Sequence, residues 1–189
     1  MRRTIERGGE LRPRAYGGTG SSMEHELSHI GEHGRARMVD VSAKPETERV
    51  AVAVARVQMQ AETLQRIREG GIAKGDVLAV AQVAGILAAK RTWELIPMCH
   101  PLPITSVDID FAFFPEERVL EIRAEVKTTA KTGVEMEALT AVQVAALTVY
   151  DMVKAVDRTL VLGPAYLLEK RGGKSGDYKR TEPLPRTCV

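Results

Sequence analysis

Apolar and polar residues alternate along four segments of the chain, and a period of two is typical of strands with one buried face. The four segments are residues 47–60, 104–113, 119–127 and 160–169. In the first segment, Val50, Val52 and Val54 occupy one face and alanines occupy the other. The second and third segments are separated by a Pro-Glu-Glu sequence at 115–117, which predicts a turn and therefore a hairpin.

Longer segments carry their apolar residues at helical spacing. Helices are expected over residues 61–69, 77 to about 96, and 134–157. Asp76 can cap the second helix and Pro97 ends it. The element order is then strand, helices, strand, strand, helix, strand. This order predicts an α+β fold of the ferredoxin-like βαββαβ type, with an antiparallel sheet and helices packed on one face.

The length of 189 residues is enough for one hydrophobic core, and we expect a single domain at residues 29–180. Residues 1–28 begin with an Arg- and Gly-rich stretch without apolar periodicity, which predicts a disordered N-terminal extension. Residues 181–189 are expected to form a flexible C-terminal tail.

The composition argues against several classes of partner. A formal net charge of +2, from 27 basic and 25 acidic residues, provides no cationic field for nucleic acid, and an aromatic content of 4% is low for a base-stacking sheet. The two cysteines, Cys99 and Cys188, form no CxxC motif, so a reducing compartment is favoured. The longest apolar runs fall short of a membrane span, and no secretory signal is evident. We expect a soluble, cytoplasmic protein without nucleic-acid or membrane partners.

Two local motifs disagree with their context. The segment from His25 to His29 matches the HExxH zinc motif, but it lies in the polar N-terminal region, so we expect no metal and no other cofactor. Residues 172–175 resemble the end of a Walker A loop, but Leu168 stands where the opening glycine belongs. The loop amides and Lys174 could still contact phosphate.

Charged residues inside the apolar segment 131–157 are the strongest sign of chemistry, because charges in apolar surroundings need partners. Asp151 and Lys154 are three residues apart and can pair on one helix face, either as a structural ion pair or as a reactive one. Glu137 shares that face but lies about 21 Å from Asp151 along the axis. A small site cannot use both from one chain, so either the substrate is long or a symmetry-related chain supplies one of them.

A Cys-His pair follows the second expected helix. Adjacent residues point in different directions on an extended backbone, which disfavours Cys99 as a nucleophile activated by His100. His100 could contact a phosphate or leaving group, and the alternative is a buried, satisfied pair between prolines. Lys74 precedes a helix N-terminus, which suits anions. Further lysines occur at element ends and could together bind polyphosphate: Lys44, Lys131, Lys170 and Lys174.

Several ordered motifs resemble those of the cyclic pyranopterin monophosphate synthase family, the molybdenum cofactor biosynthesis protein C family. The matching stretches are residues 38–42, 74–76, 88–93, 99–102, 131–141, 150–155 and 172–176. The resemblance covers about residues 29–179. It implies a ferredoxin-like fold and conversion of (8S)-3',8-cyclo-7,8-dihydroguanosine 5'-triphosphate to cyclic pyranopterin monophosphate with release of pyrophosphate.

The resemblance also implies roles and an assembly. Asp151 would be the proton acceptor, and Lys74 and Lys154 would be proton donors. The expected substrate-binding residues are Met98, Cys99, His100, Met136, Glu137, Glu135, Arg49, Lys131 and Lys170, with His100, Arg49, Lys131 and Lys170 around the triphosphate. The implied assembly is a homohexamer, a trimer of dimers, with the pocket at a dimer interface. The alternative function is a non-catalytic nucleotide-holding module, in which the Asp151–Lys154 pair serves stability alone.

Overall fold

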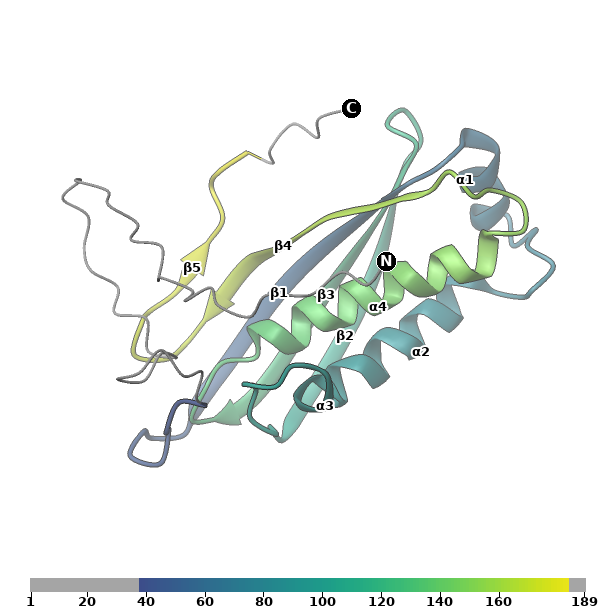
Figure 1. Ribbon diagram of the computed structural model, residues 1–189. Helices are drawn as coiled ribbons and strands as arrows, with labels where there is room; N and C mark the ends of the chain where they lie inside the picture. The colour runs from purple at the N-terminus through teal and green to yellow at the C-terminus, as the bar shows by residue number, and fades with distance from the viewer. Residues whose placement is uncertain (1–37, 184–189) are drawn as a thin grey trace, which may run out of the picture.

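A computed structural model describes residues 38–183. Its sheet has the strand order β2-β3-β1-β4-β5, and every neighbouring pair is antiparallel. The strands are β1 (Thr47–Gln58), β2 (Ile104–Phe114), β3 (Val119–Ala130), β4 (Val161–Arg171) and β5 (Tyr178–Lys179). The helices are α1 (Ala61–Arg68), α2 (Val77–Lys90), α3 (Thr92–Leu95) and α4 (Glu135–Val153). Helices α2 and α4 cover one face of the sheet, which confirms the predicted α+β, ferredoxin-like arrangement (Figure 1).

The central strand β1 is buried on both faces. Its small residues Ala51, Ala53 and Ala55 belong to the main core cluster, on the face that α4 covers. Val50, Val52 and Val54 alternate with them and are also buried, on the opposite face. Their register partners on β3 are Lys127, Glu125 and Arg123. The aliphatic stems of such long side chains can shield a valine stripe while their charged ends remain in water.

Helices α2 and α4 approach each other closely at a glycine. A Cβ atom added to Gly85 would lie 3.0 Å from the carbonyl oxygen of Ala141 and 3.4 Å from the Cβ of Ala145. The absence of a side chain at this position therefore sets the spacing of the two helices. This contact fixes α4, whose two ends carry the candidate site residues.

The helix boundaries differ from the sequence expectation in two places. The helix predicted over 77–96 is divided at Arg91 into α2 and α3. The buried hydroxyl of Thr92 lies in hydrogen-bond contact with the carbonyl oxygens of Ala88 and Ala89, which is a local alternative to the helical pattern. Helix α4 ends at Val153 rather than 157, because the chain then turns to bring Asp157 against α1. The predicted cap of α2 is confirmed, since the amide of Ala79 donates to Asp76 Oδ1 at 3.0 Å.

The apolar runs were expected to be too short to span a membrane, and helix α4 corrects this expectation. By length and hydropathy alone its 19 residues are enough to cross a membrane. Half of its apolar window is buried against the rest of the fold, as in the core helix of a globular domain. The expected extension at 1–28 and residues 184–189 lie outside the described part of the chain, as do Cys188 and the HExxH segment.

Candidate active site

The candidate residues gather at the two ends of α4. Glu135, Met136 and Glu137 form its first turn, and Asp151 lies in its last turn. Fourteen residues of helix separate Glu137 from Asp151, a rise of about 21 Å. One copy of the chain therefore presents two separate groups of polar residues, as the sequence spacing predicted.

At the C-terminal end of α4, three charged side chains meet, and we call them the Asp151 cluster (Lys74, Asp151, Lys154). Lys154 Nζ lies 2.6 Å from Asp151 Oδ1, and Lys74 Nζ lies 3.2 Å from Asp151 Oδ2. Lys74 also donates to the Asp151 carbonyl oxygen at 2.7 Å. Hydrogen bonds from Lys154 and then Lys74 lower the pKa of Asp151, and the bond to Asp151 raises the pKa of Lys154.

Lys74 precedes the N-terminus of α2, a place that suits anions, and its ammonium contacts Asp151. One expectation about this cluster needs correction. Asp151 and Lys154 were expected in partly apolar surroundings, yet their side chains are 58% and 52% exposed in the single chain. The apolar residues of this turn, Met152 and Val153, point to the core instead.

At the N-terminal end of α4 lies a cavity of about 320 Å³, which we call the Cys99 cavity. Its lining includes Val39, Val41, Lys44, Met98, Cys99, His100, Leu102, Thr132, Gly133, Glu135, Met136 and Glu137. Glu137 is only 4% exposed. Burial, with a smaller contribution from the charge of Glu135, raises the pKa of Glu137 to about 7. The carboxyl group is thus poised to gain or lose a proton near neutrality.

Cys99 and His100 both line this cavity, although adjacent residues were expected to point apart. Burial, and then the charge of Glu137, raises the pKa of the Cys99 thiol, which disfavours the nucleophilic thiolate. His100 Nε2 lies 2.9 Å from the carbonyl oxygen of Val39. His100 lines the Cys99 cavity, and its expected place beside a triphosphate stays a prediction.

The neighbouring cavity, of about 670 Å³, is called the lysine cavity. Its lining includes Lys44, Pro45, Thr47, Arg49, Lys131, Thr132, Gly133, Glu135, Lys170, Gly173, Lys174 and Ser175. The four lysines that the sequence placed at element ends therefore share one cavity with Arg49. The two cavities also share Lys44, Thr132, Gly133 and Glu135 in their linings, so they adjoin each other.

Some donors in the lysine cavity are held by the protein and others are not. Lys131 Nζ donates to the Ser42 carbonyl oxygen at 2.9 Å, and Lys170 Nζ lies 2.7 Å from Ser175 Oγ. Among the residues that the structure describes, Arg49 Nε and Thr47 Oγ1 are buried without a hydrogen-bond partner. Buried polar atoms normally have partners, so oxygen atoms of a ligand in this cavity would satisfy these two groups.

The glycine-rich loop after β4 borders the lysine cavity. Gly172 and Gly173 have φ of 86° and 92°, a region that other residues adopt with strain. A Cβ at Gly173 would collide with the Arg49 guanidinium, so the loop lies directly against that side chain. The Walker A resemblance ends here, because the loop leads into β5 and not into a helix.

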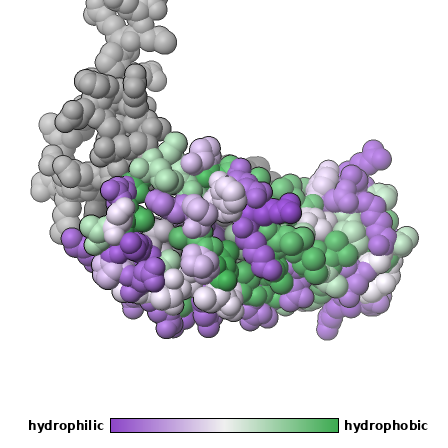
Figure 2. Space-filling model, turned by 90° about the horizontal axis from the view of Figure 1, so that it is seen from below, coloured by the Kyte–Doolittle hydropathy of each residue, from purple (hydrophilic) through white to green (hydrophobic). Residues whose placement is uncertain are grey.

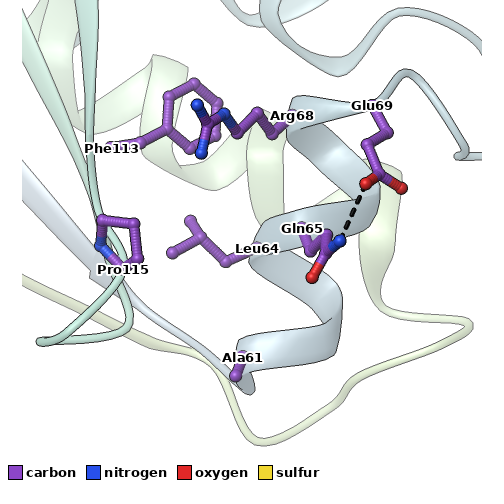
Figure 3. A pocket seen from close by; sticks show the side chains of 7 residues that line it. All are labelled: Ala61, Leu64, Gln65, Arg68, Glu69, Phe113 and Pro115. Carbon is purple, nitrogen blue, oxygen red and sulfur yellow. Dashed lines mark hydrogen bonds between the residues drawn. The ribbon is translucent and has the colours of Figure 1, made fainter.

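Sequence reasoning did not select every lining residue. Thr47 carried no signal beyond its position at an element end, Thr132 was noted only within the matching stretch 131–141, and Ser175 only as part of the loop. A separate cavity of about 390 Å³ lies between α1 and the β2–β3 turn and contains none of the candidate residues. Leu64, Arg68, Phe113 and Pro115 line it, and Gln65 bonds Glu69 at its rim (Figure 3).

Within residues 38–183, no group of three or more His, Cys, Asp or Glu side chains could hold a metal ion. His25 and His29 lie outside this range.

Comparison with known proteins agrees with the sequence motifs. The model of the MoaC family matches residues 38–173. A cyclic pyranopterin monophosphate synthase of Brevibacillus brevis is 65% identical over 160 residues, which cover 85% of this chain and 99% of the relative. Enzymes of the same name from Desulfitobacterium hafniense and Thermomicrobium roseum are 64% and 62% identical, and the alignments cover 86% and 85% of this chain and 99% and 97% of the relatives.

Proposed function

The chain belongs to the MoaC family, the cyclic pyranopterin monophosphate synthases of molybdenum cofactor biosynthesis, and from this premise we propose how its residues divide the lyase reaction. The cavities at the N-terminal end of α4 bind the substrate, and the Asp151 cluster of a second chain transfers protons. The observation that carries the proposal is the separation of Glu137 from Asp151 along one continuous helix. Residues that serve one small substrate must then come from two chains.

The lysine cavity suits the triphosphate of (8S)-3',8-cyclo-7,8-dihydroguanosine 5'-triphosphate. Lys131 and Lys170 already lie at its wall, and the unpartnered Arg49 Nε and Thr47 Oγ1 can donate to phosphate oxygens. To close the cyclic phosphate, a hydroxyl oxygen of the substrate bonds to the α-phosphorus and loses its proton. The bond from the α-phosphorus to pyrophosphate breaks, and negative charge grows on the leaving pyrophosphate. Fixed cations stabilise that charge, which is the expected contribution of this cavity to the rate.

The Cys99 cavity suits the heterocycle. Met98 and Met136 provide apolar contact, and Glu137 lies buried beside them. With a pKa of about 7, Glu137 can donate one hydrogen bond when protonated and accept others. A pterin precursor presents amide-like donors and acceptors along its edge, so such a carboxyl group can match it. His100 and Cys99 complete the wall of this cavity.

Asp151 is assigned as proton acceptor, and Lys74 and Lys154 are assigned as proton donors. In the exposed cluster of a single chain, the pKa of Asp151 is lowered, which makes it a weak base. Closure of the cluster against a second chain would remove water and shift these pKa values toward neutrality. The proposed assembly therefore changes the chemistry of the cluster as well as its position.

The outer surface of α2 offers a face for such assembly. Val80, Val83 and Leu87 are 43%, 57% and 50% exposed, and Figure 2 shows hydrophobic side chains gathered on this underside of the molecule. An apolar stripe of this kind is typical of a surface that a partner covers. We assign it to contact between copies in a homohexamer built as a trimer of dimers. We also propose that the protein acts in the cytoplasm and that residues 29–180 form its catalytic domain.

Subunit complementation tests the two-chain site. A mixture of Glu137→Ala and Asp151→Ala proteins should recover up to about a quarter of the parent activity, because half of randomly paired dimers are mixed and each has one intact site. The matched control mixes Glu137→Ala with Arg49→Ala, which damage the same end of α4 and should recover nothing. Efficient subunit exchange without recovery in the first mixture would show that each site is made within one chain.

A further inference from the structure

Asp157 lies in the turn after α4, three residues beyond Lys154, and is only 2% exposed. Its Oδ2 atom accepts a hydrogen bond from the backbone amide of Gln60 at 3.0 Å and lies 3.2 Å from Thr63 Oγ1. Its Oδ1 atom accepts from the Thr159 amide at 2.8 Å and lies 2.7 Å from Thr159 Oγ1. Both carboxylate oxygens are thus fully engaged in a buried place, where an unpaired charge would be costly.

These contacts supply α1 with the cap that its own sequence lacks. The N-cap residue Gln60 makes no side-chain capping bond, and Asp157, 97 positions further along the chain, instead accepts the backbone N–H of Gln60. Burial alone would raise the pKa of Asp157, but the hydrogen bonds from Gln60, Thr159 and Thr63 outweigh it and lower the pKa. The group is therefore an anion at the positive end of a helix.

Helix α1 is attached to the end of α4 at two places. Asp157 holds the first turn of α1, and Lys74, in the connection that follows α1, holds Asp151. Figure 1 shows α1 lying over the C-terminal end of α4. Between these attachments, α1 inserts Leu64 and Ile67 into the main core, and the connection that follows inserts Ile72. A short helix with so few apolar anchors depends on its cap for its orientation.

We propose that Asp157 is a positioning residue for Lys74 in the Asp151 cluster. By fixing the first turn of α1, it limits where the connection to α2 can place the Lys74 ammonium. The proposal rests on the assignment of Lys74 as a proton donor. A merely structural role would make Asp157 important for folding and leave the Lys74–Asp151 contact unchanged.

Lysine labelling separates the two roles without reference to turnover. In the full-length assembled protein, a small excess of acetic anhydride with mass spectrometry reports the rate at which each ammonium reacts. Asp157→Ala should raise the labelling rate of Lys74 about threefold or more, since an amine freed from its ion pair is more accessible, and should change that of Lys127 little. Asp157→Asn, which keeps the size and one oxygen acceptor, provides the same test if Asp157→Ala fails to fold.

Kinetics then link this contact to the reaction. Well below the unfolding temperature, Asp157→Ala should lower kcat about tenfold and leave KM within about twofold, because misplacement of a catalytic group affects the transition state most. Ile122→Val, a core truncation in β3, controls for lost stability and should change neither labelling nor kcat.

Unchanged Lys74 labelling in the Asp157 variants would overturn the proposal. Raised labelling with kcat at the parent value would also overturn it. A separate Lys74→Ala variant distinguishes the cause of that second result: full activity there would remove the assignment of Lys74 as a proton donor, whereas lost activity would show that Asp157 does not act through it.

Discussion

The ammonium of Lys154 lies 2.6 Å from Oδ1 of Asp151, one helical turn earlier on α4, and both side chains are about half exposed. Exposed ion pairs contribute little to the free energy of unfolding because water screens them. In the single chain, a pair that stabilises so little can be removed without loss of the fold. Its effect on stability can therefore be measured apart from its effect on the reaction.

We expect Asp151→Asn and Lys154→Ala to reduce pyrophosphate release about a hundredfold or more, the scale of lost proton transfer, with little change in the unfolding temperature. The measurements are pyrophosphate release, thermal unfolding and binding of the cyclic nucleotide triphosphate. Arg66→Ala, which removes another exposed ion pair, with Glu62 on α1, is the matched control. Variants that bind normally and release pyrophosphate at the parent rate would favour the non-catalytic nucleotide-holding module.

Cys99 offers a second prediction. Because its thiol pKa is raised by burial and by Glu137, the thiol form prevails at neutral pH. Cys99→Ser should therefore keep a substantial part of kcat/KM, since serine is close to cysteine in size and shape and no covalent step is lost. Cys188→Ser is the control for loss of a thiol. A covalent adduct on Cys99, trapped during turnover and seen by mass spectrometry, would contradict this.

Glu137 couples protonation to stability. Its pKa of about 7 lies above the ordinary value of 4.5, so between these values the folded chain holds a proton that the unfolded chain has released. The free energy of unfolding should then fall as pH rises through this window, by up to about 3 kcal/mol in all. Below the unfolded pKa the full stability is present.

Urea unfolding of the parent protein and Glu137→Gln at a series of pH values measures this coupling. The glutamine variant should lose the decline between about pH 4.5 and 7, and Glu62→Gln, with a side chain that is 73% exposed, should keep it. Parallel curves for the parent and Glu137→Gln would show that the buried carboxyl group does not titrate in this range.

Local patterns and long-range contacts differ in how far the sequence predicts them. Alternation along β1 and helical spacing along α4 depend on neighbouring residues, so the sheet and the Asp151–Lys154 pair could be predicted. The contact between Lys74 and Asp151 spans 77 positions and depends on how the chain before α2 packs on the end of α4. The division of the second helix at Arg91 involves the buried hydroxyl of Thr92, and β5 has only two residues, too few for a period to appear.

The same distinction explains the candidate site. Cationic residues at element ends were visible in the sequence, but their convergence on one cavity required the sheet register that places Arg49 and Lys170 on adjacent strands. The burial of Glu137 likewise depends on the loops around the first turn of α4. Its raised pKa therefore had no sequence signal beyond a carboxylate in an apolar helix.

The last prediction uses two glycines of one loop. Gly173 and Gly176 both have positive φ, 92° and 71°, so an alanine strains the backbone at either position. A Cβ at Gly173 would also collide with the Arg49 guanidinium, whereas a Cβ at Gly176 meets nothing within 4 Å. Both substitutions should lower stability by about 1–2 kcal/mol, but only Gly173→Ala should displace Arg49.

If Arg49 binds the triphosphate, Gly173→Ala should weaken pyrophosphate binding about tenfold or more, the scale of a lost charge-assisted hydrogen bond, and Gly176→Ala should leave it nearly unchanged. Isothermal titration calorimetry with pyrophosphate, at a temperature where both variants are folded, gives the dissociation constants. Equal weakening in the two variants would mean that general loop strain controls binding. Tight binding in both variants would show that Arg49 does not bind the phosphate, because the collision at Gly173 displaces its guanidinium.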